Sequence, residues 1–203
     1  MLQFFKNIFM NRKYQLGYSD SKPSMYKEDE RIKKANKTVA ILKDYLNEIS
    51  TLDLLDIGSS TGIMTNEYAK HFKHVTGVDL DTKGIQYSTN RYKRNNLKFI
   101  CSPIEEIDIS DSSFDVITCS QIYEHVPSDK KLMEEILRLL KPGGICYFAA
   151  VNRFKIIEPH YQLPFLSFLP KKAANIYIRI FTKYDLYYEN LKSLRNLKKL
   201  VSD

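Results

Sequence analysis

Hydrophobic residues change their spacing near residue 50, and this change separates two kinds of predicted element. Before it, apolar residues recur at every third and fourth position, which predicts one amphipathic helix. Its apolar positions are Ile32, Ala35, Val39, Leu42, Leu46 and Ile49. After it, short runs are apolar throughout, and such runs are typical of strands that are buried on both faces.

Five of these apolar runs alternate with helical segments. The predicted strands are Leu52–Ile57, Val75–Leu80, Leu97–Cys101, Phe114–Ser120 and Ile145–Val151. The predicted helices are Ile63–Phe72, Thr82–Tyr92 and Ser128–Lys141, the last capped by Ser128 and stopped by Gly143 and Gly144. This alternation predicts an α/β fold with a doubly wound, mainly parallel sheet that carries helices on both faces.

Three segments follow from this pattern. We predict an N-terminal segment of residues 1–28, an α/β domain of residues 29–151, and a C-terminal cap with a helical tail, residues 152–203. The cap is rich in proline and aromatic residues, and its basic helix is predicted around Leu186–Leu200. No apolar run approaches about 18 residues, so no membrane-spanning helix is expected.

Composition and charge narrow the class of protein. Hydrophobic residues make up 43% and charged residues 27%, as in ordinary globular proteins. Cys101, Cys119 and Cys146 lie far apart in apolar runs, which predicts reduced thiols in a cytoplasmic protein. The net charge is +7, but no block of five basic residues and no nucleic-acid-binding motif occurs, so we predict no nucleic-acid partner.

Two strand ends carry the candidate chemistry. The first strand runs through Asp56 into a turn from Gly58 to Gly62 and then into a helix, whose N-terminus offers free N–H groups to an anion. The second strand ends near Asp79, 21 residues after Gly58, close to the spacing of about 20 residues at which a carboxylate reaches a ribose. Together they predict a cofactor that contains adenosine.

The composition of the turn separates two such cofactors. A dinucleotide fingerprint requires further glycines at the positions of Ser60 and Ile63, and neither residue is glycine. A pyrophosphate would therefore lose its closest approach to the backbone, whereas a smaller ligand with a carboxylate tolerates Ser60. A nicotinamide dinucleotide is disfavoured.

Five motifs in one order carry a resemblance that covers about residues 30–151. They are Leu54-Leu55-Asp56-Ile57-Gly58 with Gly62, Val75-Thr76-Gly77-Val78-Asp79, Ser113-Phe114-Asp115-Val116-Ile117, Glu124-His125-Val126, and Leu139-Leu140-Lys141-Pro142-Gly143-Gly144. This series resembles the class I methyltransferases that depend on S-adenosylmethionine (SAM). Within them it is similar to the ubiquinone and menaquinone biosynthesis type. The fold that it implies is Rossmann-like.

The resemblance implies a set of SAM-binding residues. Asp56 and the turn would hold the methionine end, Asp79 the ribose, Leu80 and Ile104 the adenine, and Ser120 would lie near the sulfonium. The full set is Asp56, Gly58, Ser59, Ser60, Gly62, Asp79, Leu80, Ile104 and Ser120. Pro103 stands where the family often has an acid that binds the adenine, so Glu105 or a backbone carbonyl would have to replace it.

The same resemblance directs attention to the residues after the fourth strand. His125 is the candidate general base for an oxygen nucleophile, the alternative being a residue that only bonds backbone at a helix entry. Some quinone-type relatives bind a metal through Glu-x-x-Glu-His, but Gln121 holds the first position here, so we predict no metal site. Tyr123, Arg153 and His160 are predicted to contact the acceptor.

These features predict an enzyme, a SAM-dependent methyltransferase that acts at oxygen on a small-molecule, glycan or lipid-linked acceptor. Two alternatives stay open, a shortened and catalytically weak domain that serves as a binding partner, and a nicotinamide-dependent oxidoreductase. The family's usual C-terminal β-hairpin is not predicted, so the fifth strand should be an edge. A homodimer or the segment Met1–Asn11 would cover it, and a peripheral membrane contact also stays open.

Overall fold

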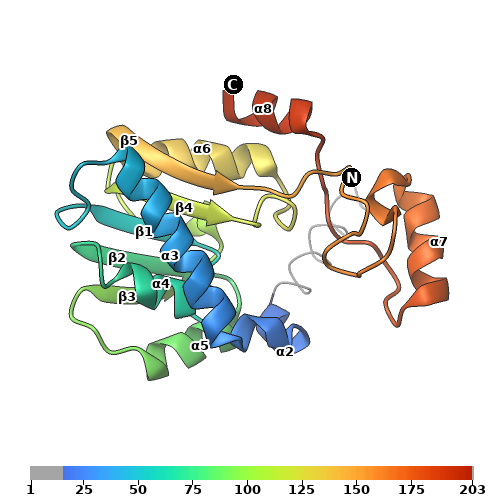
Figure 1. The fold of residues 1–203 in the computed structure, drawn as a ribbon, viewed down its shortest axis with the longest axis horizontal. Helices are drawn as coiled ribbons and strands as arrows, with labels where there is room; N and C mark the ends of the chain where they lie inside the picture. Colours follow the sequence, from blue (N-terminus) through green and yellow to red (C-terminus); the bar gives the residue numbers. More distant parts are fainter. Residues whose placement is uncertain (1–15, 203) are drawn as a thin grey trace.

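A five-stranded parallel sheet forms the centre of the molecule, which the computed structural model describes over residues 16–202 (Figure 1). The sheet order is β3-β2-β1-β4-β5, and every neighbouring pair is parallel. The strands are β1 (Asp53–Ile57), β2 (His74–Asp79), β3 (Leu97–Cys101), β4 (Phe114–Ser120) and β5 (Leu140–Ala149). The order turns back between β1 and β4, which opens a crevice at their carboxyl ends.

Helices cover both faces of this sheet and extend beyond it. They are α2 (Tyr18–Ser21), α3 (Glu28–Tyr45), α4 (Ile63–Tyr68), α5 (Thr82–Arg91), α6 (Asp129–Leu139), α7 (Lys171–Phe181) and α8 (Leu194–Ser202). Successive residues of β1 face opposite layers, because side chains alternate along a strand. Leu54 packs in a core with α3 and α4, and Leu55 in a second core with α6. The predicted doubly wound α/β fold is confirmed.

The predicted elements match the structure best within the sheet. β3 and β4 have the predicted bounds, and Ser128 caps α6 by accepting from the Lys131 N–H at 3.3 Å. The prediction that Gly143 and Gly144 stop this helix is wrong. The helix ends at Leu139, and both glycines lie inside β5, whose register against β4 is irregular between Phe114 and Val116. The glycines accommodate this irregularity instead.

The cap also departs from the prediction. α7 was not expected, and the helix at the C-terminal end begins at Leu194 rather than near Leu186. α7 begins directly after Pro170, in a segment whose prolines and aromatic residues indicate irregular structure rather than a helix. The cap has its own small core, formed by Tyr161, Leu166, Ala174, Ile178 and Tyr187.

β5 lies at the edge of the sheet, as predicted. Within residues 16–202 no strand pairs with its outer side, and only two isolated bridges follow it, between Asn152 and Lys192 and between Ile157 and Pro164. The segment Met1–Asn11, expected as one cover for this edge, lies outside the described residues.

Two glycines give the turn after β1 its shape. Gly58 and Gly62 have φ of +79° and +71°, in the left-handed region that other residues adopt at a cost. A Cβ on Gly62 would also overlap Ser88 Cβ and come within 2.8 Å of the Phe99 ring. The turn therefore depends on glycine both for its backbone angles and for its close approach to α5 and β3.

Gly62→Ala should lower the free energy of unfolding more than a matched change elsewhere. Gly143 also has positive φ, +80°, but no atom lies within 4 Å of the position of its Cβ. We expect Gly143→Ala to cost about 1 kcal/mol from backbone strain and Gly62→Ala about 3 kcal/mol from strain plus overpacking. Urea unfolding of both variants measures the difference. Equal losses would show that contact with Ser88 and Phe99 contributes nothing.

Candidate functional site

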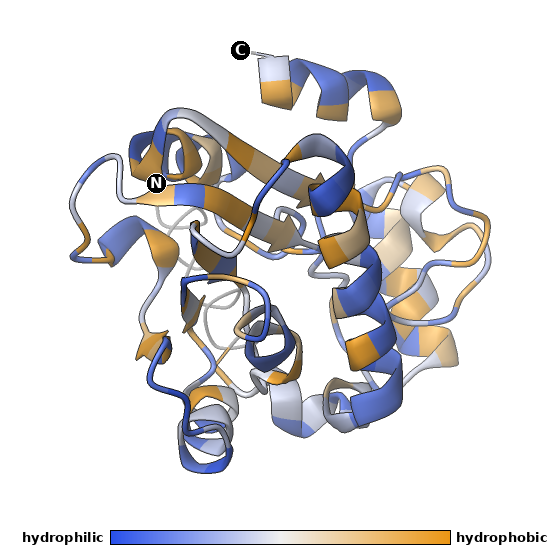
Figure 2. Cartoon of the chain, turned by 60° about the vertical axis from the view of Figure 1, so that its left-hand side comes forward, coloured by the Kyte–Doolittle hydropathy of each residue, from blue (hydrophilic) through white to orange (hydrophobic). Residues whose placement is uncertain are grey.

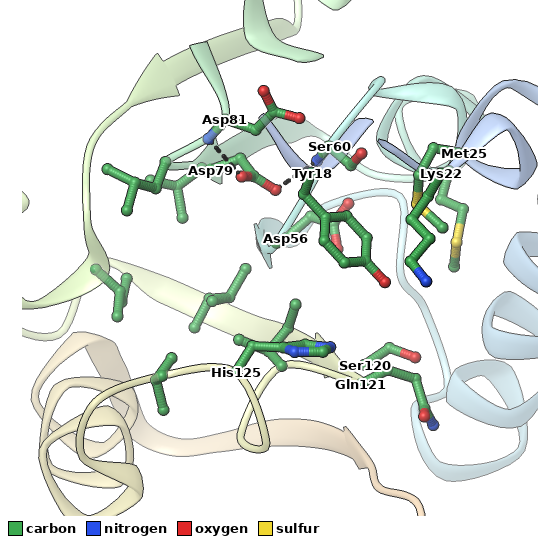
Figure 3. Close-up of a pocket in the computed structure, with 18 of the residues that line it drawn as sticks. Tyr18, Lys22, Met25, Asp56, Ser60, Asp79, Asp81, Ser120, Gln121 and His125 are labelled. Atoms are coloured by element: carbon green, nitrogen blue, oxygen red, sulfur yellow. Dashed lines mark hydrogen bonds between the residues drawn. The ribbon is translucent and has the colours of Figure 1, made fainter. Parts of the chain in front are cut away.

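A cavity of about 350 Å³ opens at the carboxyl ends of β1, β2 and β4 (Figure 3). Asp56, Gly58 and Ser60 from the first strand and its turn line it, and so does Asp79 from the second strand. The two strand ends singled out in the sequence therefore face one hollow. Its volume falls within the range of about 300–1,000 Å³ typical of small-molecule sites.

Asp79 joins the two turns of this site. Its Oδ2 accepts from the Ser60 N–H at 2.8 Å and its Oδ1 accepts from the Asp81 N–H at 2.8 Å. Burial raises the pKa of the Asp79 carboxyl, although these backbone donors oppose the shift. Each carboxylate oxygen keeps further acceptor capacity toward the cavity, which is the chemistry needed to bind a cis-diol.

Asp56 is held by hydroxyl groups at the end of β1. Thr65 donates to its Oδ2 at 2.6 Å and Thr118 donates to its Oδ1 at 2.7 Å. Burial raises the pKa of Asp56 to about 6, while the two threonines oppose this rise. The carboxyl thus links β1 to α4 and β4 at the floor of the cavity.

Arg31 on α3 adds a positive charge that sequence reasoning missed. Its side chain lines the cavity beside Asp56, and its Nε is buried without a hydrogen-bond partner. A buried guanidinium nitrogen without a partner is costly, and a carboxylate ligand would satisfy it. Nothing in the local sequence separates Arg31 from the other charged residues of α3.

The segment with α2 covers the cavity, which was also missed. Tyr18 and Lys22 line the cavity opposite the strand ends, and Figure 3 shows the Tyr18 ring reaching between Asp79 and His125. Two long-range bonds fix this segment. The Ser19 N–H donates to Asp81 Oδ2 at 2.7 Å, and the Thr61 hydroxyl donates to the Met25 carbonyl at 2.7 Å.

Two histidines from distant segments meet at the other end of the cavity. The rings of His125 and His160 lie 4.9 Å apart, edge to face, and both residues line the cavity. An oxygen of Glu124 and one nitrogen of each ring lie within 4.8 Å of one another. Burial, together with the neighbouring His160 and Lys22, lowers the pKa of His125 to about 3.

The structure brings most of the predicted site residues together. Those that line the cavity are Asp56, Gly58, Ser60, Asp79, Leu80, Ile104, Ser120, His125 and His160. Ser59 and Gly62 do not line it. Tyr123 is buried, and its hydroxyl donates to the Val151 carbonyl at 2.8 Å and accepts from the Lys192 N–H at 3.0 Å. Arg153 lines a second cavity in the cap and donates to the Ser167 carbonyl at 2.8 Å.

Comparisons of sequence point to one family. The methyltransferase domain family matches residues 55–148 of this chain. A ubiquinone biosynthesis O-methyltransferase of Coxiella burnetii is 34% identical over 102 residues, which cover 49% of this chain and 44% of the relative. The protein of the same name from Rickettsia conorii is 29% identical over 167 residues, covering 77% of this chain and 56% of the relative. The chain thus spans about half the length of these relatives.

Solved structures share the fold at lower identity. The YcgJ protein of Bacillus subtilis has a TM-score of 0.61 and 18% identity, and the match covers 81% of this chain and 66% of that one. A putative methyltransferase from Haloferax volcanii, solved with the Trm112 activator, has a TM-score of 0.60 and 16% identity, covering 86% and 70%. The structural matches show a shared fold, and the sequence match assigns residues 55–148 to the class I methyltransferase domains, an enzyme class whose methyl donor is SAM.

Proposed function

We propose that this chain transfers a methyl group from SAM to a hydroxyl oxygen of a small-molecule or lipid-linked acceptor. The observation that carries the proposal is the shared cavity of the glycine turn and Asp79. A class I domain supplies the donor half of the reaction, and the names of the curated relatives, which are O-methyltransferases, favour oxygen as the acceptor atom.

The lining residues suit the three parts of SAM. The turn at Gly58 and Ser60 and the positive charge of Arg31 suit the methionine end, because its carboxylate needs N–H donors and a cation. Asp79 suits the ribose diol. Glu105 lines the cavity beside Pro103 and is our candidate for the adenine acceptor that Pro103 lacks. Ser59 and Gly62 would act through the shape of the turn.

Asp79→Ala should lower SAM affinity about 10- to 100-fold, because it removes hydrogen bonds between a carboxylate and the ribose. Asp108→Ala, at an exposed acid outside the cavity, is the control and should bind as wild type does. Calorimetry with SAM and S-adenosylhomocysteine measures both. A folded Asp79→Ala protein with full affinity would contradict the ribose assignment.

The same calorimetry separates the alternative functions. A domain that serves only as a binding partner should give no heat with either ligand, and a nicotinamide-dependent enzyme should bind NADH instead. Wild-type binding of SAM without binding of NADH supports the methyltransferase.

We also propose that the outward face of α7 contacts an anionic membrane surface. No helix within residues 16–202 is long and apolar enough to cross a membrane. At 3.6 residues per turn, Ile176 and Ile180 project opposite the buried Ala174 and Ile178, and they are 59% and 67% exposed. Other residues of the cap are hydrophobic as well (Figure 2), and several of them have exposed side chains.

The charge around this face selects the kind of partner. On α7, Lys172 and Arg179 lie beside the two isoleucines, and Lys183 follows the end of the helix. Residues 151–203 hold ten basic against four acidic residues. Basic residues near an anionic bilayer each contribute about 1 kcal/mol, and an interfacial helix adds burial of its apolar face. Such contact would bring a lipid-linked acceptor close to the cavity.

The double variant Ile176→Asp, Ile180→Asp should bind phosphatidylglycerol vesicles at least about fivefold more weakly. The reason is that two isoleucines, which would be buried in the bilayer interface, become negatively charged aspartates. Leu137→Asp on α6, at a residue that is 64% exposed, is the matched control and should bind as wild type. Co-sedimentation measures binding. Equal binding of both variants to the vesicles would overturn the membrane contact. So would a dimer, seen by analytical ultracentrifugation of the wild-type protein, that the double variant loses and the control keeps.

A further inference from the structure

Three buried glutamates surround His160 where the cap meets the end of β4. Glu124 follows β4, and Glu158 and Glu189 belong to the cap, with exposures of 0%, 0% and 1%. Buried carboxylates are costly unless hydrogen bonds or opposite charges compensate them. Because these glutamates lie beside the cavity at the strand ends, we looked for a role of the cluster in the proposed reaction.

Glu158 fixes the ring of His160. Its Oε1 accepts from Nδ1 of His160 at 2.7 Å, and its Oε2 accepts the backbone N–H groups of His160 and Tyr161, each at 2.8 Å. An ionised carboxylate only accepts hydrogen bonds, so we assign the hydrogen of this contact to Nδ1 of His160. In the neutral ring Nε2 is then the free acceptor.

His160 also reaches the place where an acceptor would lie. It lines the same cavity as Asp56, Asp79 and Ser120, although its side chain is only 9% exposed. Lys22 from the covering segment donates to the His160 carbonyl at 2.9 Å, so the histidine is held from its backbone as well as from its ring.

We propose that Glu158 and His160 form a catalytic dyad in which Nε2 of His160 removes the proton of the acceptor hydroxyl. The inference rests on the proposed methyltransferase function. The hydroxyl oxygen bonds to the methyl carbon as the carbon–sulfur bond of SAM breaks. The hydroxyl proton moves to Nε2, and S-adenosylhomocysteine leaves as a neutral thioether. Glu158 balances the imidazolium charge until the proton passes to solvent.

The charges around the two histidines favour His160 over His125 as the base. Burial lowers the pKa of His160, but the Glu158 hydrogen bond and the carboxylates of Glu189, Glu158 and Glu124 outweigh it, so the pKa is raised. His125 has a pKa of about 3 from burial and from the nearby His160 and Lys22, which makes it a weak proton acceptor. His125 is then a neutral neighbour that packs against the base.

The test uses the full chain and tritiated SAM, with a lipid and small-molecule extract of the source cells as the acceptor pool. His160→Asn should lower tritium transfer by at least about 100-fold with unchanged affinity for S-adenosylhomocysteine, because only proton removal is lost. His125→Asn should lower it much less. His71→Asn, at a histidine outside the cavity, is the control and should transfer as wild type.

The Glu158→Gln variant tests whether Glu158 supports proton removal by His160 or only holds the histidine in place. Loss of the carboxylate destabilises the imidazolium, so the pKa of His160 falls and the acidic limb of the pH–rate profile moves to lower pH, with transfer reduced about tenfold. NMR titration of the histidines measures the lower pKa of His160 directly. It therefore shows whether Glu158 controls the protonation of His160 even where the extract holds no acceptor. An unchanged His160 pKa would overturn the dyad.

Two further results would also overturn it. One is full transfer by folded His160→Asn. The other is transfer that stops on chelation and returns with Mg²⁺ or Mn²⁺, since Glu124, His125 and His160 would then bind a cation instead of moving a proton. Failure of the proposed function looks different, because the wild-type protein would then bind neither SAM nor S-adenosylhomocysteine.

Discussion

The bridge made by the Asp79 carboxylate is the contact on which the cavity depends. It accepts one backbone N–H from the turn after β1 and another from the turn after β2, so two loops that follow different strands are held at one distance. The parallel pairing of β1 with β2 brings these loops together, but pairing alone leaves them free to separate beyond the strand ends. Asp79 keeps them close and still faces the cavity.

The contacts that close the cavity extend from this bridge. Asp81, which donates to Asp79, accepts from Ser19 in the covering segment, and Lys22 from that segment reaches the carbonyl of His160 in the cap. A short series of hydrogen bonds thus connects the strand ends, the cover and the cap. Displacement of any one of these parts would alter the shape of the cavity at the other two.

The sequence predicted what local patterns determine. The strands, the glycine turn and Asp79 follow from residues close together in the chain. β1 to β4 lie within one residue of their predicted bounds, whereas β5 begins at Leu140 rather than at Ile145. Arg31 and Tyr18 reach the cavity from segments that precede the sheet, and the Glu158–His160 pair reaches it from the cap that follows the sheet, so no spacing in the sequence could reveal their meeting. The error at Gly143 and Gly144 has a similar origin, because glycine permits both a helix end and an irregular strand, and only pairing with β4 selects between them.

The region that matches the methyltransferase family supplies only part of the cavity lining. Asp56, Gly58 and Asp79 lie inside the region that matches the methyltransferase family, residues 55–148. Tyr18, Arg31, Glu158 and His160 lie outside it, yet line or support the same cavity. Under the proposed function, the matched domain would therefore supply most of the groups that hold the methyl donor. The rest of the cavity lining comes from segments outside that match, so under the proposed function the determinants of the acceptor are to be sought in the cover and the cap as well as in the domain.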